Sequence, residues 1–284
     1  EEVLSLIFEA DRSDSLNANL NRAARASAQI RDRLSSDVLR VVSQFGSAAR
    51  TVDGVVWGYV STGDALAVLN RCIIMLAGLR GFEVGNITRG PGWHFLSMGR
   101  RMERAIRLID IFRAIVVPLS AETWPTLEML LEVADSTITY RSRYFTALQA
   151  APVLDLIMND DTNPRSLAFQ VNSLIGHCAG LAKMPSGTGW PAAKQRQVEA
   201  AAARLFGADV QALCEVDPNF ATAKKIVIDD EEVDPPLRPN LDALLADLGA
   251  ALPNLSEAIA NTYFSHALME RVMERSMEPL EGAW

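Results

Sequence analysis

The sequence predicts an all-α fold, a bundle of about eight to ten antiparallel helices. Apolar residues recur every three or four positions along most of the chain, whereas long runs of alternating polar and apolar residues are missing. The stretches between the helical patterns are short, which favours antiparallel neighbours. Neither a GxGxxG nor a GxxxxGKS/T motif occurs, so we expect no nucleotide-binding α/β domain. With 284 residues, 49% of them hydrophobic, the chain is long enough for one large domain or two modest ones.

Capping signals place the first helices. They are expected at about 15–34, 37–50 and 65–82. Ser35 and Ser36 can cap the second helix, and Ser61 with Asp64 forms a capping-box pattern ahead of the third.

Later helices follow the same logic. They are expected at about 92–112, 120–149, 165–182, 191–206 and 238–275. Pro118 should end or kink the first of these, and Ser120 can cap the next. Asn163 followed by Pro164 is predicted to cap the helix after that. A short segment, 224–229, has β-like composition but stands alone, and the acidic segment 229–234 is expected to be a solvated loop.

Residues 3–30 resemble residues 153–181 at an offset of 150, which becomes 151 after one inserted residue. Eight identities support the match: Val3/Val153, Leu4/Leu154, Leu6/Leu156, Ile7/Ile157, Asp11/Asp161, Ser15/Ser166, Leu16/Leu167 and Asn21/Asn172. Both copies predict a short apolar helix, a polar turn and a longer helix. We interpret the match as an internal duplication, with convergent amphipathic patterning as the alternative.

Composition excludes several functions. A net charge of −8 argues against a general nucleic-acid binder, which needs a basic face. The three cysteines are far apart and form no CxxC pair, so we expect reduced thiols of a cytoplasmic protein and no metal site. We find no signal peptide and no apolar run of about 18 residues, so we expect no membrane insertion. The chain opens inside a helical pattern, and we expect that it was cut from a longer protein.

One stretch, GWHFLSMGRRMERAIRLIDIF (92–112), concentrates charge on one helical face. At 100° per residue, five side chains fall within an arc of about 120°: Arg100, Glu103, Arg104, Arg107 and Asp110. Trp93, Leu96 and Ile111 share this arc, so we expect a seam that is partly shielded by another helix. Pairs three or four residues apart, such as Arg107 with Asp110, can form within the helix.

Two interpretations of this face remain open. The commoner one is an interhelical salt-bridge network. The other is a seam that binds a carboxylate or another anion, because guanidinium groups offer planar, two-pronged donors. Candidate binding residues are Arg100, Glu103, Arg104, Arg107, Arg31, Arg33 and Arg165.

The run GWHFLSMGRRMERA resembles the signature of the alpha-E domain family, a helical family named for its Glu-Arg motif. The matching residues are Gly92, Trp93, Phe95, Leu96, Gly99, Arg100, Glu103, Arg104, Ala105 and Asp110. Segments 31–35, 163–171 and 263–267 resemble other parts of the family, so the likeness covers nearly the whole chain. This resemblance implies that residues 1–284 form a single helical domain. Family members usually begin with an earlier Glu-Arg helix, which this sequence lacks, so it looks like the domain without its first helices.

This resemblance implies a helical partner of a circularly permuted ATP-grasp protein, a class of predicted amidoligases. A transglutaminase-like peptidase and a proteasome-like hydrolase accompany such systems. ATP and Mg²⁺ are implied for the ATP-grasp partner, and no cofactor is expected in this chain.

Three functions follow as hypotheses. The chain is a substrate-positioning module of the amidoligase, a purely structural or protein-interaction bundle, or an acyl- or peptidyl-transfer enzyme that uses Glu103. Glu103 sits among arginines, which favour its ionised form and make it a weak base, so the enzyme is the least favoured of the three.

Overall fold

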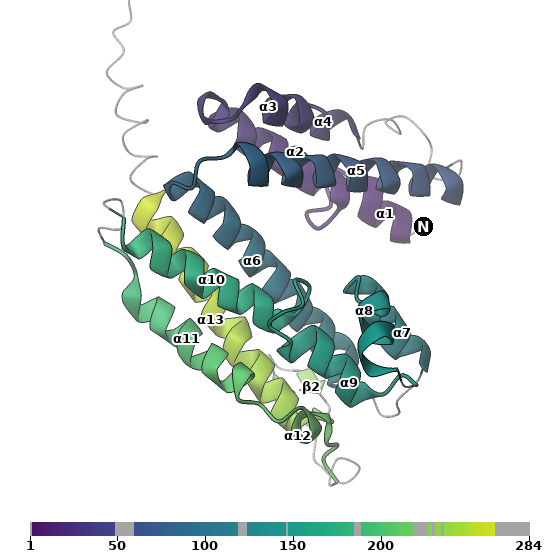
Figure 1. Ribbon diagram of the computed structural model, residues 1–284. Helices are drawn as coiled ribbons and strands as arrows, with labels where there is room; N and C mark the ends of the chain where they lie inside the picture. The colour runs from purple at the N-terminus through teal and green to yellow at the C-terminus, as the bar shows by residue number, and fades with distance from the viewer. Residues whose placement is uncertain are drawn as a thin grey trace, which may run out of the picture. The chain divides into compact units, whose positions relative to one another are not determined.

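The computed structural model describes eight segments of the chain, residues 2–48, 60–118, 124–145, 147–184, 189–218, 226–228, 231–233 and 236–264. These residues confirm the all-α fold class. Ten α-helices of at least seven residues lie in the described segments, and three further α-helices have four or five residues. The chain divides into two compact units, Glu1–Arg89 and Gly90–Trp284, which are described separately (Figure 1). The single domain and the internal duplication stay predictions.

The first unit is a cluster of short helices around one long helix. Its elements are α1 (Glu2–Phe8), α2 (Leu16–Gln29), the 3-10 helix η1 (Arg31–Arg33), α3 (Ser36–Ser43), α4 (Phe45–Ala48) and α5 (Thr62–Asn86). The predicted Ser61–Asp64 capping box is confirmed, since each residue's side chain accepts the other's backbone N–H at 3.1 Å. Ser35 caps α3, as predicted. The core of this unit is formed by Ile7, Phe8, Leu20, Val38, Val42, Phe45, Ala65, Val68, Cys72 and Met75.

Helix α5 is apolar on more than its buried side. Its exposed face carries five large hydrophobic side chains, Leu66, Ile73, Ile74, Leu76 and Val84. By length and composition alone α5 is long enough and apolar enough to cross a membrane, and 22% of that window is buried. Core helices of soluble proteins pass the same test. The expectation that the chain does not insert into a membrane therefore stays a prediction.

The second unit contains a four-helix bundle. Its elements are α6 (Pro91–Ile111), the π-helical turn η4 (Phe112–Val116), α7 (Trp124–Val133), α8 (Thr137–Tyr144), α9 (Ala150–Leu154), the π-helical turn η5 (Asp155–Asn159), α10 (Leu167–Ala182), α11 (Ala192–Phe206), α12 (Val210–Cys214), β1 (Ile226–Ile228), β2 (Glu231–Val233) and α13 (Pro239–Tyr263).

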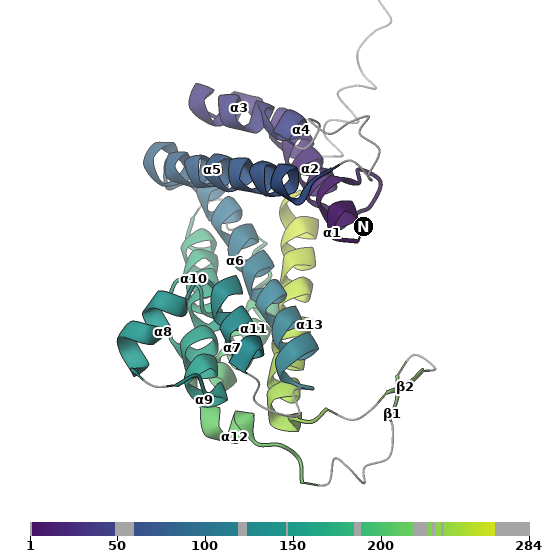
Figure 2. The same ribbon diagram turned by 90° about the vertical axis from the view of Figure 1, so that its right-hand side faces the viewer.

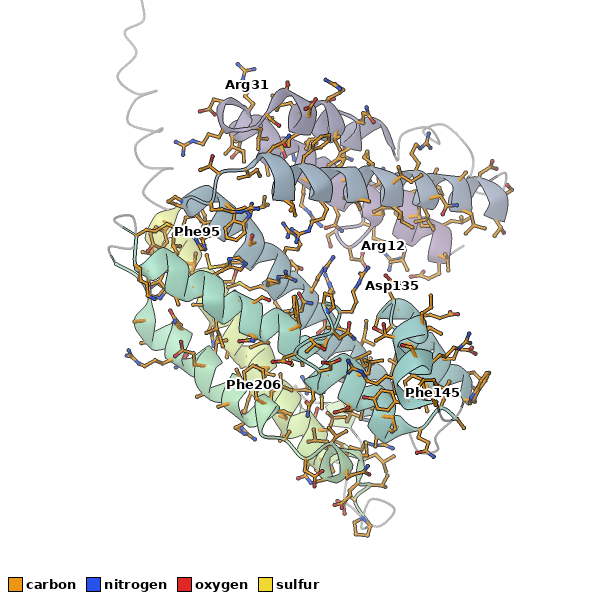
Figure 3. The ribbon with its side chains drawn as sticks, in the orientation of Figure 1. Arg12, Arg31, Phe95, Asp135, Phe145 and Phe206 are labelled. Carbon is orange, nitrogen blue, oxygen red and sulfur yellow. The ribbon has the colours of Figure 1, made fainter. Side chains whose placement is uncertain are left out.

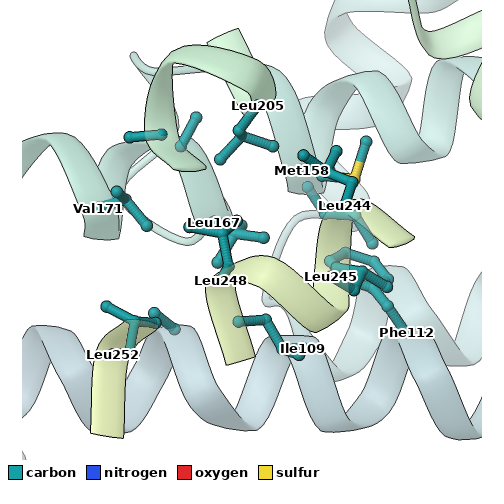
Figure 4. Packing of buried hydrophobic residues seen from close by; sticks show 14 of the residues in the cluster. Ile109, Phe112, Met158, Leu167, Val171, Leu205, Leu244, Leu245, Leu248 and Leu252 are labelled. Atoms are coloured by element: carbon teal, nitrogen blue, oxygen red, sulfur yellow. The ribbon is translucent and has the colours of Figure 1, made fainter. Parts of the chain in front are cut away.

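Helices α6, α10, α11 and α13 close into a ring in which each contacts its two neighbours (Figures 1 and 2). Cross-helix contacts show that α6 runs antiparallel to α10, because Met98 lies against Cys178 while Arg101 reaches Gln170. Leucines from α10, α11 and α13 meet Ile109 and Phe112 in the core (Figure 4). Packing in this bundle buries one face of α6 and leaves the opposite face exposed.

The structure corrects several predicted boundaries. The helix predicted over 120–149 is two helices, because Asp135 adopts a left-handed backbone conformation (φ 49°) that ends α7. Ser120 lies outside the described residues. Helix α10 is capped by Ser166, whose side chain accepts from the Phe169 N–H, and the predicted cap at Asn163 is wrong.

The C-terminal half differs from the prediction in its loops. Residues 231–233, expected to be loop, pair as β2 with the β-like segment in an antiparallel hairpin, with Ile226 opposite Val233. The last helix runs through Pro253 to Tyr263, and the part predicted beyond residue 264 lies outside the described residues.

Candidate functional site

Helix α6 begins at Pro91 because a proline in the first turn needs no N–H partner. Its buried stripe, formed by Met98, Met102, Ala105 and Ile109, packs into the bundle. The expectation that the charged face is a shielded seam is wrong in part. Glu103, Arg104, Arg107 and Asp110 are exposed, while Arg100 and the apolar neighbours Trp93 and Ile111 are half-buried. The charged face is therefore available to a ligand or partner.

A cavity of about 250 Å³ lies between α6, the end of α7 and the start of α10. It is lined by Glu103, Arg104, Arg107, Leu108, Ile111, Val133, Ala134, Arg165 and Gln170. Four of the predicted site residues, Glu103, Arg104, Arg107 and Arg165, thus come together from two segments about sixty positions apart. Gln170 and Ala134 are buried, so they form the floor, and the charged side chains stand around them.

Arg165 is placed by the turn that precedes α10. The buried Asn163 accepts a bond from the Arg165 N–H at 3.0 Å and donates to the Ser136 hydroxyl and to the Leu156 carbonyl. The Arg165 guanidinium contacts the Asp135 carboxylate at 2.6 Å. Asp135 lies at the junction of α7 and α8 (Figure 3), where its left-handed backbone conformation follows the end of α7. The break between α7 and α8 therefore also positions an arginine of the cavity.

The sequence interpretation missed Gln170, which lines the cavity, and Arg101, which bonds to it. Gln170 is fully buried; its Oε1 accepts from Arg101 at 2.9 Å and its Nε2 donates to the Pro164 carbonyl at 2.6 Å. The Arg101 guanidinium also lies 5.0 Å from the centre of the Phe169 ring. The signal was a glutamine inside the apolar face of a predicted helix, where a polar side chain needs buried partners.

The remaining predicted residues do not line the cavity. Arg100 lies one turn before Glu103 on α6. Arg31 and Arg33 are exposed in η1 of the first unit (Figure 3 labels Arg31), and Arg33 lies 4.0 Å from Asp32. The predicted pair between Arg107 and Asp110 is present at 3.5 Å between exposed groups, a geometry that contributes little stability.

A second polar cluster lies at the start of α6. His94 Nδ1 is 3.4 Å from His177 Nδ1, and the Trp93 ring packs edge-on against both imidazoles. Burial lowers the pKa of His94, and its bond with His177 opposes this effect.

Cys178, next to His177, faces Met98 instead, and burial raises its pKa to about 12. This thiol is neutral near pH 7, so it lacks the thiolate that a Cys–His dyad requires. Within the described segments, no group of three or more His, Cys, Asp or Glu side chains could hold a metal ion.

Comparison with known protein families decides the identity of the chain. Residues 1–264 match the model of Alpha-E, described as a predicted alpha-helical domain with a conserved ER motif. The chain belongs to the Alpha-E family. Within the described residues, Glu103-Arg104 is the one Glu-Arg pair, and both side chains line the cavity. This Glu-Arg pair of the chain therefore lies at the cavity between α6, α7 and α10.

This Alpha-E chain has longer relatives. It is 27% identical to an uncharacterised protein of Mycobacterium tuberculosis, Rv2567, and to one of Mycobacterium bovis, Mb2597. Each alignment covers 98% of this chain and 29% of the relative, so the chain spans less than a third of their length. No solved structure matches it.

Proposed function

We propose that this Alpha-E chain is a substrate-positioning module of an ATP-grasp amidoligase. It would bind an anionic group of the substrate in the cavity between α6, α7 and α10. The observation that carries the proposal is the convergence of Glu103, Arg104, Arg107 and Arg165 on one cavity with a buried glutamine in its floor. Arginine suits such a site because its fork donates two parallel bonds to a carboxylate.

The division of chemistry between the partners follows from this site. An ATP-grasp enzyme activates a carboxylate as an acyl phosphate, and it supplies the ATP and the Mg²⁺. This chain would hold and orient one substrate, with Glu103 orienting the arginines. The described residues that line the cavity include no Ser, Thr, Cys, His or Lys, which supports binding in preference to covalent catalysis. The partner is in the same polypeptide or a separate one, and a transglutaminase-like peptidase and a proteasome-like hydrolase belong to the same system. A cytoplasmic location follows from the need for ATP.

Reconstitution with the cognate ATP-grasp protein tests this proposal. ATP hydrolysis would be measured with and without the full chain, and with the variants Glu103→Ala and Arg104→Ala. We expect the chain to stimulate hydrolysis and each variant to lose most of the stimulation while keeping its circular dichroism spectrum. Arg196→Gln is the matched control, because Arg196 is an exposed arginine of α11 outside the cavity lining. A chain that neither associates with the ATP-grasp protein nor stimulates it would contradict the proposal.

The exposed face of α5 favours a second candidate, an assembly module. Ile73 and Ile74 are 63% and 73% exposed, and clusters of exposed apolar side chains are typical of protein interfaces. The longer relatives supply sequence that could cover this face, since the chain spans 29% of their length. Assembly alone predicts that Ile73→Ser with Ile74→Ser abolishes association with the ATP-grasp protein, whereas Arg104→Ala leaves association and stimulation intact. Ile138→Ser, at an isoleucine of α8 that is 83% exposed, is the control.

A further inference from the structure

We infer that the cavity between α6, α7 and α10 takes a carboxylate borne on a short aliphatic group, as at the C-terminal residue of a peptide that ends in leucine or valine. The inference rests on the proposed function, because it names the substrate class of the same site. It comes from the division of the cavity into an apolar part and a charged part.

The apolar part is large for so small a cavity. Leu108 and Ile111, one turn apart on α6, are half-buried, and Val133 and Ala134 close the opposite side from the end of α7. Val133 is 60% exposed, so its side chain is free to be covered by a ligand. Ligand sites gain affinity by burying such apolar surface. A ligand without an aliphatic group would leave these apolar side chains exposed to solvent.

The charged part offers one anionic group several donors. The lining carries three arginines and one glutamate, and two of the arginines also contact aspartates outside the lining, Arg165 with Asp135 and Arg107 with Asp110. Asp135 engages Arg165 through one terminal nitrogen at 2.6 Å, and a guanidinium has five N–H donors, so others of Arg165 stay available. Gln170 and the Asn163 turn hold the backbone of Arg165 in place. The arginine fork is therefore positioned before a ligand arrives.

Size and charge together favour a monocarboxylate over a phosphate ligand. A cavity of about 250 Å³ is smaller than the roughly 300–1,000 Å³ of drug-sized ligand sites, so it fits one amino-acid residue better than a nucleotide. Glu103 on the rim repels a dianion such as phosphate more strongly than a single carboxylate. The same carboxylate can accept the N–H of a C-terminal residue, which lies a few bonds from its carboxylate group.

Titration of the full chain with small probes tests the inference. N-acetylleucine, N-acetylleucine amide, N-acetylglycine and inorganic phosphate would each be titrated and followed by NMR. We expect N-acetylleucine to bind about tenfold more tightly than its amide, because a charge-assisted bidentate contact is lost in the amide. It should bind about fivefold more tightly than N-acetylglycine, because the leucine side chain covers the apolar wall. Equal binding of the acid and the amide, or phosphate binding as tightly as N-acetylleucine, would overturn the inference.

Two variants locate the binding. Arg165→Gln and Arg104→Gln should each weaken N-acetylleucine binding about tenfold, on a fold checked by circular dichroism. Arg196→Gln should leave it unchanged. Wild-type affinity in both cavity variants would show that the ligand binds elsewhere and that the inference is wrong.

The two proposals fail in different ways. If N-acetylleucine binds as expected but the chain does not stimulate ATP hydrolysis, the inferred ligand class stands and the amidoligase role is wrong. If stimulation depends on Arg104 but no probe prefers the aliphatic carboxylate, the amidoligase role stands and the ligand class is wrong.

Discussion

The two segments that resemble each other in sequence share their local structure but differ in what surrounds them. Ser15 and Ser166, 151 positions apart, each cap the longer helix by accepting the N–H three residues on, at 3.0 Å in both copies. Each hydroxyl also donates at 2.5 Å to the carbonyl six residues earlier, that of Glu9 in the first copy and of Asp160 in the second. The turn between short and long helix is therefore built in the same way twice.

The two segments diverge at two positions in and after this turn. Asp14 of the first segment corresponds to Arg165 of the second. Four positions after the capping serine, the first copy has the exposed Asn19 and the second has the fully buried Gln170. In the second copy this position packs against α6, whose Arg101 bonds to Gln170. One local scaffold thus supplies a solvent-facing turn in one place and part of a charged cavity in the other.

The largest effect should come from removing the buried glutamine. Gln170→Ala deletes two buried hydrogen bonds, one of them from a guanidinium, so we expect a loss of about 2–4 kcal/mol in the free energy of unfolding. The equivalent change, Asn19→Ala, removes an exposed side chain that donates to the Ser15 carbonyl at 2.7 Å, and it should cost about 1 kcal/mol or less. Urea unfolding followed by circular dichroism measures both. Similar losses would mean that the copies do not differ in the way described.

The capping serines should behave alike. Ser15→Ala and Ser166→Ala should each cost about 1–2 kcal/mol, the usual loss for an N-cap, because both hydroxyls are buried and make the same bonds. Local hydrogen exchange tests this directly, since the amides of Ala18 and Phe169 lose their acceptors in the respective variants. Ser13→Ala, at an exposed serine of the first turn, is the control. A loss at only one of the two serines would argue against equivalent turns.

Sequence reasoning succeeded where a local pattern decides the structure. The Ser61–Asp64 box and the start of α6 depend on residues within one turn, and both were predicted correctly. The sequence analysis names Arg165 and the arginines of α6 as candidate binding residues, but it does not predict that they lie close together. The roles of Gln170 and Asp135 depend on which helices become neighbours and on a left-handed residue, which periodicity does not encode.

Close packing of α10 against α6 should show at Gly180. A Cβ at this position would lie 2.5 Å from His94 Cε1, so Gly180→Ala forces the imidazole to move. Overpacking costs about 1–3 kcal/mol, and the better helix propensity of alanine returns roughly 1, so we expect a net loss of about 1 kcal/mol. Gly176→Ala on the same helix meets nothing within 4 Å and should stabilise the protein by up to about 1 kcal/mol. Thermal unfolding of the two variants should therefore shift in opposite directions, and a stabilised Gly180→Ala would contradict the packing described.

The smallest expected effect is the pH dependence of this contact. Burial lowers the pKa of His94 below its ordinary value despite the bond with His177, so the unfolded chain binds a proton there more readily than the folded chain. The contribution of His94 is therefore complete above the unfolded pKa of about 6.5 and is lost as the pH falls through that value towards the lowered folded pKa. Urea unfolding gives the free energy of unfolding of wild type and of His94→Gln at about pH 8.0 and about pH 5.5. These two values lie on either side of the unfolded pKa of about 6.5. The wild type should lose more stability than the variant between the two conditions. Equal losses would mean that protonation of His94 does not oppose the packing of α6 on α10.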